Sequence, residues 1–228
     1  GILLRDKNGL HEVAVRREII LSAGAIQSPK LLQLSGIGPR ALLESLAIPV
    51  VVDAPGVGAN LREHRYLSFT YKVRGNSLNQ KLSGLGLIAS VLRYFFGSKG
   101  ALTHGAHEVG GFIKTQASPD RPDAQIGLGL YSFHTDAKGA VVLDPYPGMT
   151  VIAYYLRPDS QGQVRISAAD PDAPPVIDAN HLATDADRRH FVALFRWLRD
   201  LATQPALKDW IVAETGKTVG IETDEDIL

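Results

Sequence analysis

Residues 18–38 constrain the fold of this chain more than any other stretch. The run 19–21, Ile-Ile-Leu, is typical of a short strand covered on both faces. The small residues of 22–25 then predict a turn whose backbone a ligand can approach closely. Ser28 is suited to cap a helix and Pro29 to occupy its first position. The end of that helix is predicted by Gly36, Gly38 and Pro39.

A strand, a small-residue turn and a helix N-terminus in this order predict an anion site. Backbone N–H groups without a helical partner, and the positive end of the helix dipole, point at whatever enters the turn. The local pattern is also compatible with a strand, turn and helix that bind nothing, and it does not decide between the two.

The composition bounds the class of protein. A chain of 228 residues, 45% apolar and 21% charged, can bury a substantial core and is not of the disordered type. The formal net charge is zero, which gives no argument for nucleic acid or an anionic membrane as partner. The chain has no cysteine, so disulfides, thiolate metal sites and a cysteine nucleophile are excluded.

No apolar run approaches the roughly 20 residues that span a bilayer, and the N-terminus lacks the layout of a signal peptide. We therefore expect a soluble protein without a membrane span, in the cytoplasm, with a periplasmic location left open. Both ends fall within expected secondary structure, which suggests a fragment of a larger enzyme. The oligomeric state is not predicted.

Upstream of residue 65 the pattern alternates strand with helix. A hairpin is expected from strands at 2–4 and 13–15 around Asn8-Gly9, followed after residue 38 by a helix at 40–46 and a buried strand at 48–52. Downstream the expected strands are amphipathic, so a domain boundary is placed near residue 65.

The downstream part predicts an antiparallel sheet flanked by helices. Its strands are expected at 66–73, 123–131 and 149–156, and a helix within 85–96. Thr184, with Asp187 three residues later, predicts the start of a further helix. The apolar stripe of that helix predicts core packing and consists of Phe191, Leu194, Phe195, Leu198 and Leu201. The fold class is therefore α+β.

Three motifs resemble the glucose-methanol-choline (GMC) flavoprotein oxidoreductases. The stretch 22–38 is similar to the second signature of that family, and 53–64 to a loop of its FAD-binding domain, with Ala59, Arg62 and Glu63 as departures. Residues 157–164, with Pro174-Pro175, resemble the start of its C-terminal module. The resemblance implies the tail of an α/β FAD-binding domain at 1–65 and a substrate domain, incomplete at its C-terminus, at 66–228.

The resemblance also implies site residues. Ala23 and Gly24 would lie near the FAD dinucleotide. Residues 107–112 resemble a strand entry beside the substrate cavity, so Glu108 would hold a cationic or hydroxylic substrate with His107 next to it. The alternative for Glu108 is an exposed or internally paired carboxylate. His104 and His107 also suggest a metal site, but no third ligand has a sensible spacing, so no metal is predicted.

No catalytic residue is expected within the chain. The two matches to the dinucleotide fingerprint, at 36–41 and 84–89, do not follow a strand, and no serine-hydrolase elbow occurs. In the family the fingerprint lies upstream and the base histidine downstream. His181 after Asn180 corresponds instead to a structural position of the family.

The resemblance implies oxidation of a primary or secondary alcohol, choline-like or other, with hydride passing to flavin. FAD is expected in the full-length protein, whereas the chain alone is predicted to be inactive and to bind FAD weakly or not at all. The competing hypothesis is a non-enzymatic binding or interaction module that keeps the substrate-domain fold. Neither the alcohol nor the electron acceptor, oxygen or quinone, is predicted.

Overall fold

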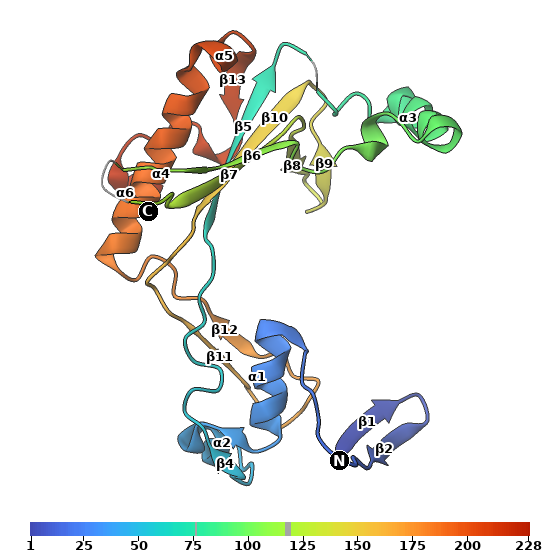
Figure 1. The fold of residues 1–228 in the computed structure, drawn as a ribbon, viewed down its shortest axis with the longest axis vertical. Helices are drawn as coiled ribbons and strands as arrows, with labels where there is room; N and C mark the ends of the chain where they lie inside the picture. Colours follow the sequence, from blue (N-terminus) through green and yellow to red (C-terminus); the bar gives the residue numbers. More distant parts are fainter. Residues whose placement is uncertain (76, 117–119) are drawn as a thin grey trace. The chain divides into compact units, whose positions relative to one another are not determined.

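The computed structural model describes residues 1–75, 77–116 and 120–228 (Figure 1). Asn76 and residues 117–119, all within the predicted substrate domain, lie outside the described residues. The chain divides into two compact units, one formed by 1–61 with 161–180 and the other by 62–160 with 181–228. The predicted boundary near residue 65 treats each domain as one continuous segment, whereas 161–180 belong to the first unit. The assignment of FAD-binding and substrate domains stays a prediction.

The first unit contains two helices and three small two-stranded sheets. The sheets pair β1 with β2 and β11 with β12 in antiparallel fashion and β3 with β4 in parallel. The elements are β1 (Ile2–Asp6), β2 (Gly9–Val13), α1 (Gly24–Leu34), β3 (Ile37–Gly38), α2 (Arg40–Ser45), β4 (Val52–Asp53), β11 (Gln163–Arg165) and β12 (Val176–Asp178). The predicted hairpin and the helix at 40–46 are confirmed, although the second strand of the hairpin begins at Gly9 rather than at Val13.

The predicted buried strand at 19–21 is wrong. These residues form no strand, and Ile20 is 81% exposed. A strand covered on both faces needs neighbouring strands, and no described strand pairs with this run. The strand expected at 48–52 is likewise reduced to β4, with Val51 exposed. The apolar run 19–21 therefore pairs with no described strand, and of the run 48–52 only Val52 is part of a strand, in the short parallel pair with β3.

The start of α1 also differs from the prediction. The helix begins at Gly24, with Pro29 inside it, and Ser28 is not its N-cap. Instead the Ser28 hydroxyl accepts a hydrogen bond from the backbone N–H of Ala23, at 3.1 Å, just before the helix. The predicted end is confirmed, because Gly36 adopts φ +80 directly after the C-cap residue Ser35, a conformation that favours glycine.

The interior of the first unit is organised around a polar side chain. Gln33 of α1 is fully buried and donates from Nε2 to the carbonyl oxygens of Val57 (3.1 Å) and Val164 (3.0 Å). Its Oε1 accepts the backbone N–H of Ile166 at 2.9 Å. A buried amide costs free energy unless it is hydrogen-bonded, and here each polar atom has a partner. Leu43, Ile48 and Ile166 form the adjoining apolar cluster.

The second unit is built on a five-stranded antiparallel sheet in the order β13-β5-β10-β7-β6 (Figure 1). This confirms the α+β class and the antiparallel sheet of the prediction. The strands of the sheet are β5 (Tyr66–Val73), β6 (Val109–Ile113), β7 (Ala124–Gly129), β10 (Gly148–Tyr155) and β13 (Ile211–Thr215). The remaining elements are α3 (Gly84–Gly97), η1 (Ala101–Thr103), β8 (Phe133–Thr135), β9 (Val141–Leu143), α4 (Asp185–Thr203), α5 (Pro205–Lys208), η2 (Gly216–Thr218) and α6 (Asp224–Ile227).

Helix α4 covers one face of this sheet, as its apolar stripe predicts. Phe191, Leu194, Phe195 and Leu198 are buried against alternate residues of β5 and β10. The Thr184 hydroxyl caps the helix by accepting the N–H of Asp187, at 3.1 Å. Among the described helices none is long and apolar enough to cross a membrane.

The carboxylate of Asp187 has a second role that the capping pattern did not predict. It accepts the backbone N–H groups of Asp159 (3.0 Å) and Ser160 (2.7 Å) and the Ser160 hydroxyl. Burial raises the pKa of Asp187, but these hydrogen bonds to the charged form outweigh it and leave the pKa below its ordinary value. Asp187 thus fixes the segment at which the chain leaves the second unit.

Candidate functional site

The predicted cofactor residues Ala23 and Gly24 lie at the exposed turn that begins α1, Ala23 as its N-cap and Gly24 as its first residue. Gly24 adopts φ +81, and a Cβ placed on it would meet no atom within 4 Å, so the turn is open on that side. The N–H of Ala23 is taken by Ser28, while the N–H groups of Ala25 and Ile26, in the first helical turn, have no partner within the helix. The geometry therefore offers backbone donors and the positive end of a helix dipole to an anion.

The predicted substrate residues His107 and Glu108 lie together where the chain enters β6. The backbone N–H of Glu108 is bonded to the carbonyl oxygen of Leu128 on β7, at 3.1 Å. Its carboxylate oxygen Oε1 lies 2.6 Å from Nδ1 of His104. Glu108 thus has a partner at both its backbone and its side chain. The contact with His104 agrees with the alternative of an internally paired carboxylate.

Two glycines of β7 allow this loop to lie on the sheet. A Cβ at Gly127 would come within 3.1 Å of the His107 ring, and a Cβ at Gly129 within 2.7 Å of the carbonyl oxygen of Ala106. The second distance is too short for a real side chain, so an alanine there would displace residues 104–108. The absence of side chains at these positions gives the loop its place.

A row of side chains crosses the same face of the sheet, opposite α4. Phe112 pairs with Gln125, Gln125 with Tyr154, and Tyr154 with Tyr66, so the four side chains point to one side. We call them the cross-strand row. Phe112 and Tyr66 are more than 60% exposed, and the His64 ring stacks on Tyr154 at 4.7 Å.

The cross-strand row was missed from the sequence. Each of its members alternates with core residues of its strand, which is a detectable signal. Which residues pair across strands, however, depends on the register, and the register cannot be read from one strand alone. Nε2 of His64 lies 3.2 Å from the carbonyl oxygen of Leu156, a contact that braces the end of the 53–64 loop.

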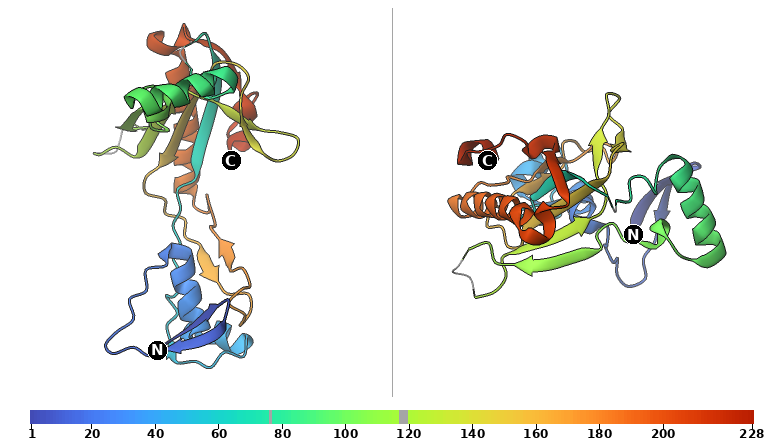
Figure 2. Two further views of the ribbon diagram at one scale, coloured as in Figure 1. Left: turned by 90° about the vertical axis from the view of Figure 1, so that its right-hand side faces the viewer. Right: turned by 90° about the horizontal axis from the view of Figure 1, so that it is seen from above.

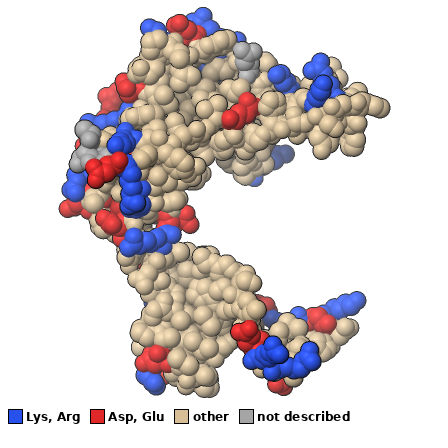
Figure 3. Space-filling model, viewed as in Figure 1, with Lys and Arg blue, Asp and Glu red and all other residues tan. Residues whose placement is uncertain are grey.

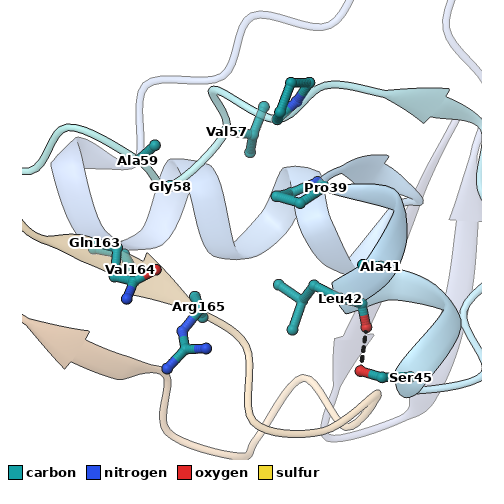
Figure 4. Close-up of a pocket in the computed structure, with 11 residues that line it drawn as sticks. Pro39, Ala41, Leu42, Ser45, Val57, Gly58, Ala59, Gln163, Val164 and Arg165 are labelled. Carbon is teal, nitrogen blue, oxygen red and sulfur yellow. Dashed lines mark hydrogen bonds between the residues drawn. The ribbon is translucent and has the colours of Figure 1, made fainter.

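A separate pocket of about 360 Å³ lies within the first unit (Figure 4). Side chains from α2, the 55–59 loop and β11 line it, and they are mostly apolar apart from Ser45, Gln163 and Arg165. Ser45 in its wall donates to the Leu42 carbonyl oxygen at 2.7 Å. None of the predicted site residues lines this pocket.

Within the described ranges, no three His, Cys, Asp or Glu side chains are grouped so as to hold a metal ion. His104 and Glu108 form a pair rather than a ligand set.

Two family models match the chain, both with the description GMC oxidoreductase. An N-terminal model matches residues 1–66 and a C-terminal model residues 158–227. Among curated proteins, the chain is 36% identical over 217 residues to an oxygen-dependent choline dehydrogenase of Pseudomonas fluorescens, with 95% of this chain covered. A protein of the same name from Acinetobacter baumannii is 32% identical over 227 residues, with 99% covered. The chain spans 38% and 41% of the length of these two relatives.

Solved structures give the same result. A formate oxidase of Aspergillus oryzae, studied for modification of its FAD, superimposes with a TM-score of 0.86 at 26% identity, over all of this chain and 44% of that one. A pyridoxine 4-oxidase from Mesorbium loti has a TM-score of 0.74 at 24% identity, over 99% of this chain and 40% of that one, which is a likeness of fold.

Proposed function

The chain belongs to the GMC oxidoreductase family, and from this premise we propose that it forms the tail of the FAD-binding domain and most of the substrate domain of an enzyme that oxidises an alcohol. The single observation that carries the proposal is the arrangement around β6. Glu108, whose carboxylate lies 2.6 Å from Nδ1 of His104, directly precedes the strand that contributes Phe112 to the cross-strand row, and α4 covers the opposite face of the sheet. The expected compartment is the cytoplasm.

The residues at the turn fit the cofactor that the family implies. Ala23 and Gly24 would lie against the dinucleotide of FAD, with the open side of Gly24 admitting a phosphate and the N–H groups of the first turn donating to it. FAD, when bound, supplies a hydride acceptor for the alcohol carbon.

Glu108 is proposed to orient the substrate. A carboxylate attracts a cationic group and accepts a hydrogen bond from a hydroxyl, and aromatic faces such as those of Tyr66 and Tyr154 also attract quaternary ammonium groups. A choline-like alcohol therefore suits this face, and several relatives are named choline dehydrogenases. His107, lying over Gly127, would limit access from the side of β7.

The chain is not proposed to carry out the reaction alone. By resemblance to the family, the residue that takes the hydroxyl proton is expected in a segment downstream of residue 228 and the dinucleotide fingerprint in a segment upstream. We therefore expect the 228-residue chain to bind FAD weakly or not at all and to be inactive. Turnover of any alcohol by this chain with added FAD would contradict that expectation.

The test is the visible absorption spectrum of the protein expressed from the complete reading frame that contains this chain, recorded after free cofactor has been removed. Flavin bands that bleach on addition of choline or another alcohol support the proposal. A colourless protein that stays colourless after reconstitution with FAD overturns it and favours the alternative, a binding module. Reoxidation by oxygen or by a quinone then identifies the electron acceptor.

A further inference from the structure

Helix α3 exposes an apolar stripe along its length. Five of its large apolar side chains form this stripe, with exposed fractions of 83% for Leu85, 58% for Ile88, 52% for Leu92, 77% for Phe95 and 86% for Phe96. Their spacing places them on one side of a helix of 3.6 residues per turn. In Figure 1 and in the right-hand view of Figure 2, α3 stands away from the five-stranded sheet of its unit. We call these five residues the α3 stripe.

The orientation of the α3 stripe is fixed by the opposite side of the helix. Ser90 is buried and donates from its hydroxyl to the Lys81 carbonyl oxygen at 2.8 Å. Gly86 lies so close to the backbone of Gln80 that no Cβ could fit between them. The 3-10 helix η1 contacts α3 beyond its C-terminal end. The small residues Gly86 and Ser90 therefore contact residues 80–81, while the α3 stripe faces solvent.

The surroundings of the stripe are basic. The sequence from 74 to 107 contains Arg74, Lys81, Arg93 and Lys99 and no Asp or Glu. All four of these cationic residues are exposed. Figure 3 shows blue side chains against the tan surface at the position that α3 has in Figure 1. The zero net charge of the whole chain thus hides a local excess of positive charge.

We propose that α3 binds the surface of an anionic lipid bilayer. An in-plane helix inserts an apolar side between acyl chains while Lys and Arg reach the headgroups, and both elements are present here. With 14 residues, α3 is about 21 Å long, too short for the roughly 30 Å hydrocarbon core, so it lies in the interface and does not span it. A symmetric dimer through this helix is disfavoured, because it would bring Arg93 and the flanking lysines of both copies together.

The proposal is tested by flotation, with vesicles, of the protein expressed from the complete reading frame that contains this chain. We expect about tenfold or more protein to float with phosphatidylcholine containing about 30 mol% phosphatidylglycerol than with phosphatidylcholine alone, and the difference to shrink in roughly 0.5 M salt. The double variant Phe95→Ser/Phe96→Ser should not float and should stay in the fraction of unbound protein. Arg93→Glu/Lys99→Glu should lose the preference for the anionic vesicles.

Matched variants exclude a general effect of charge or apolar surface. Val141→Ser/Val212→Ser removes two exposed apolar side chains elsewhere in the same unit. Lys138→Glu/Lys217→Glu reverses the charge at two exposed lysines away from α3. Both double variants should float like the parent. Circular dichroism verifies that each variant is folded. No flotation of the parent, equal flotation of Phe95→Ser/Phe96→Ser, or a dimer that the same double variant dissociates would each overturn the proposal.

Discussion

The side-chain nitrogen of Gln33 lies 3.0 Å from the carbonyl oxygen of Val164, which follows it by 131 positions in the chain. Through this hydrogen bond, and through the one that Gln33 accepts from Ile166, the first helix is joined to a strand that the chain reaches only after most of the second unit. The first unit is therefore complete only when two distant segments meet at one buried amide.

Replacing Gln33 by Leu should destabilise the first unit by about 2 to 4 kcal/mol, because the partly buried carbonyl of Val57, the buried carbonyl of Val164 and the buried N–H of Ile166 lose their partner. Urea denaturation followed by circular dichroism measures this change. Gln27→Leu, at an exposed position of the same helix, serves as the control and should change stability by less than about 0.5 kcal/mol. Equal stability of the two variants would show that the amide is not required.

Gly58→Ala should destabilise the chain by about 2 to 4 kcal/mol. Gly58 adopts φ +84, and a Cβ there would meet the Val164 carbonyl oxygen and come within 2.5 Å of Nε2 of Gln33. Gly56→Ala is the matched control, because a Cβ at Gly56 meets nothing within 4 Å and its φ is not in the left-handed region. Thermal unfolding of both variants measures the difference. Equal melting temperatures of Gly58→Ala and Gly56→Ala would contradict the close packing of Gly58 against Val164 and Gln33.

The Asp187 carboxylate should make stability depend on acid. Its pKa is lower in the folded than in the unfolded chain, so its contribution is complete above the ordinary value of 3.8 and is lost as the pH falls through the folded value. We expect Asp187→Asn to cost about 1.5 to 3 kcal/mol at pH 6 and progressively less below pH 3.8. Urea titrations of the parent and the variant at several pH values test this.

The control for that experiment is Asp185→Asn, in the first turn of the same helix, whose side chain is 85% exposed. Its effect should be small and should vary little over the same pH range. A constant cost of Asp187→Asn down to pH 2 would mean that the hydrogen bonds do not depend on the charge of the carboxylate.

In the full-length enzyme, Glu108→Gln should raise KM for a cationic alcohol such as choline about tenfold while leaving KM for an uncharged alcohol nearly unchanged. His104→Ala should have a smaller effect in the same direction, because the Glu108 carboxylate loses the contact that positions it but keeps its charge. Glu222→Gln, at an exposed position, is the control. Equal changes for both alcohols would remove the proposed role of Glu108 in charge recognition.

Local signals predicted the helices of this fold well. The stripe from Phe191 to Leu201 and the cap at Thr184 describe α4 correctly, and Gly36 describes the end of α1. Each of these signals acts within about four residues, which is the range over which helix geometry is decided. The start of α1 was predicted incorrectly. Ser28 lies inside the helix, and its hydroxyl accepts a hydrogen bond from the N–H of Ala23 instead of capping a helix that begins at Pro29.

Contacts between residues far apart in the chain could not be predicted from local sequence patterns. An apolar run such as 19–21 does not reveal whether a partner strand exists, and the pairing of Phe112 with Gln125 or of Tyr154 with Tyr66 follows from the register. The basic surroundings of α3 were missed for another reason, since the net charge of a whole chain averages over regions of opposite sign.

The discontinuous first unit has a consequence for synthesis on the ribosome. Gln33 leaves the exit tunnel long before its partners at 164 and 166, so the buried amide stays hydrated while the intervening strands emerge. Strands β5, β7 and β10 are likewise synthesised before α4, which begins at Asp185 and covers one face of their sheet. Nascent chains between these lengths expose an uncovered apolar sheet face, and we expect them to be the ones that chaperones bind.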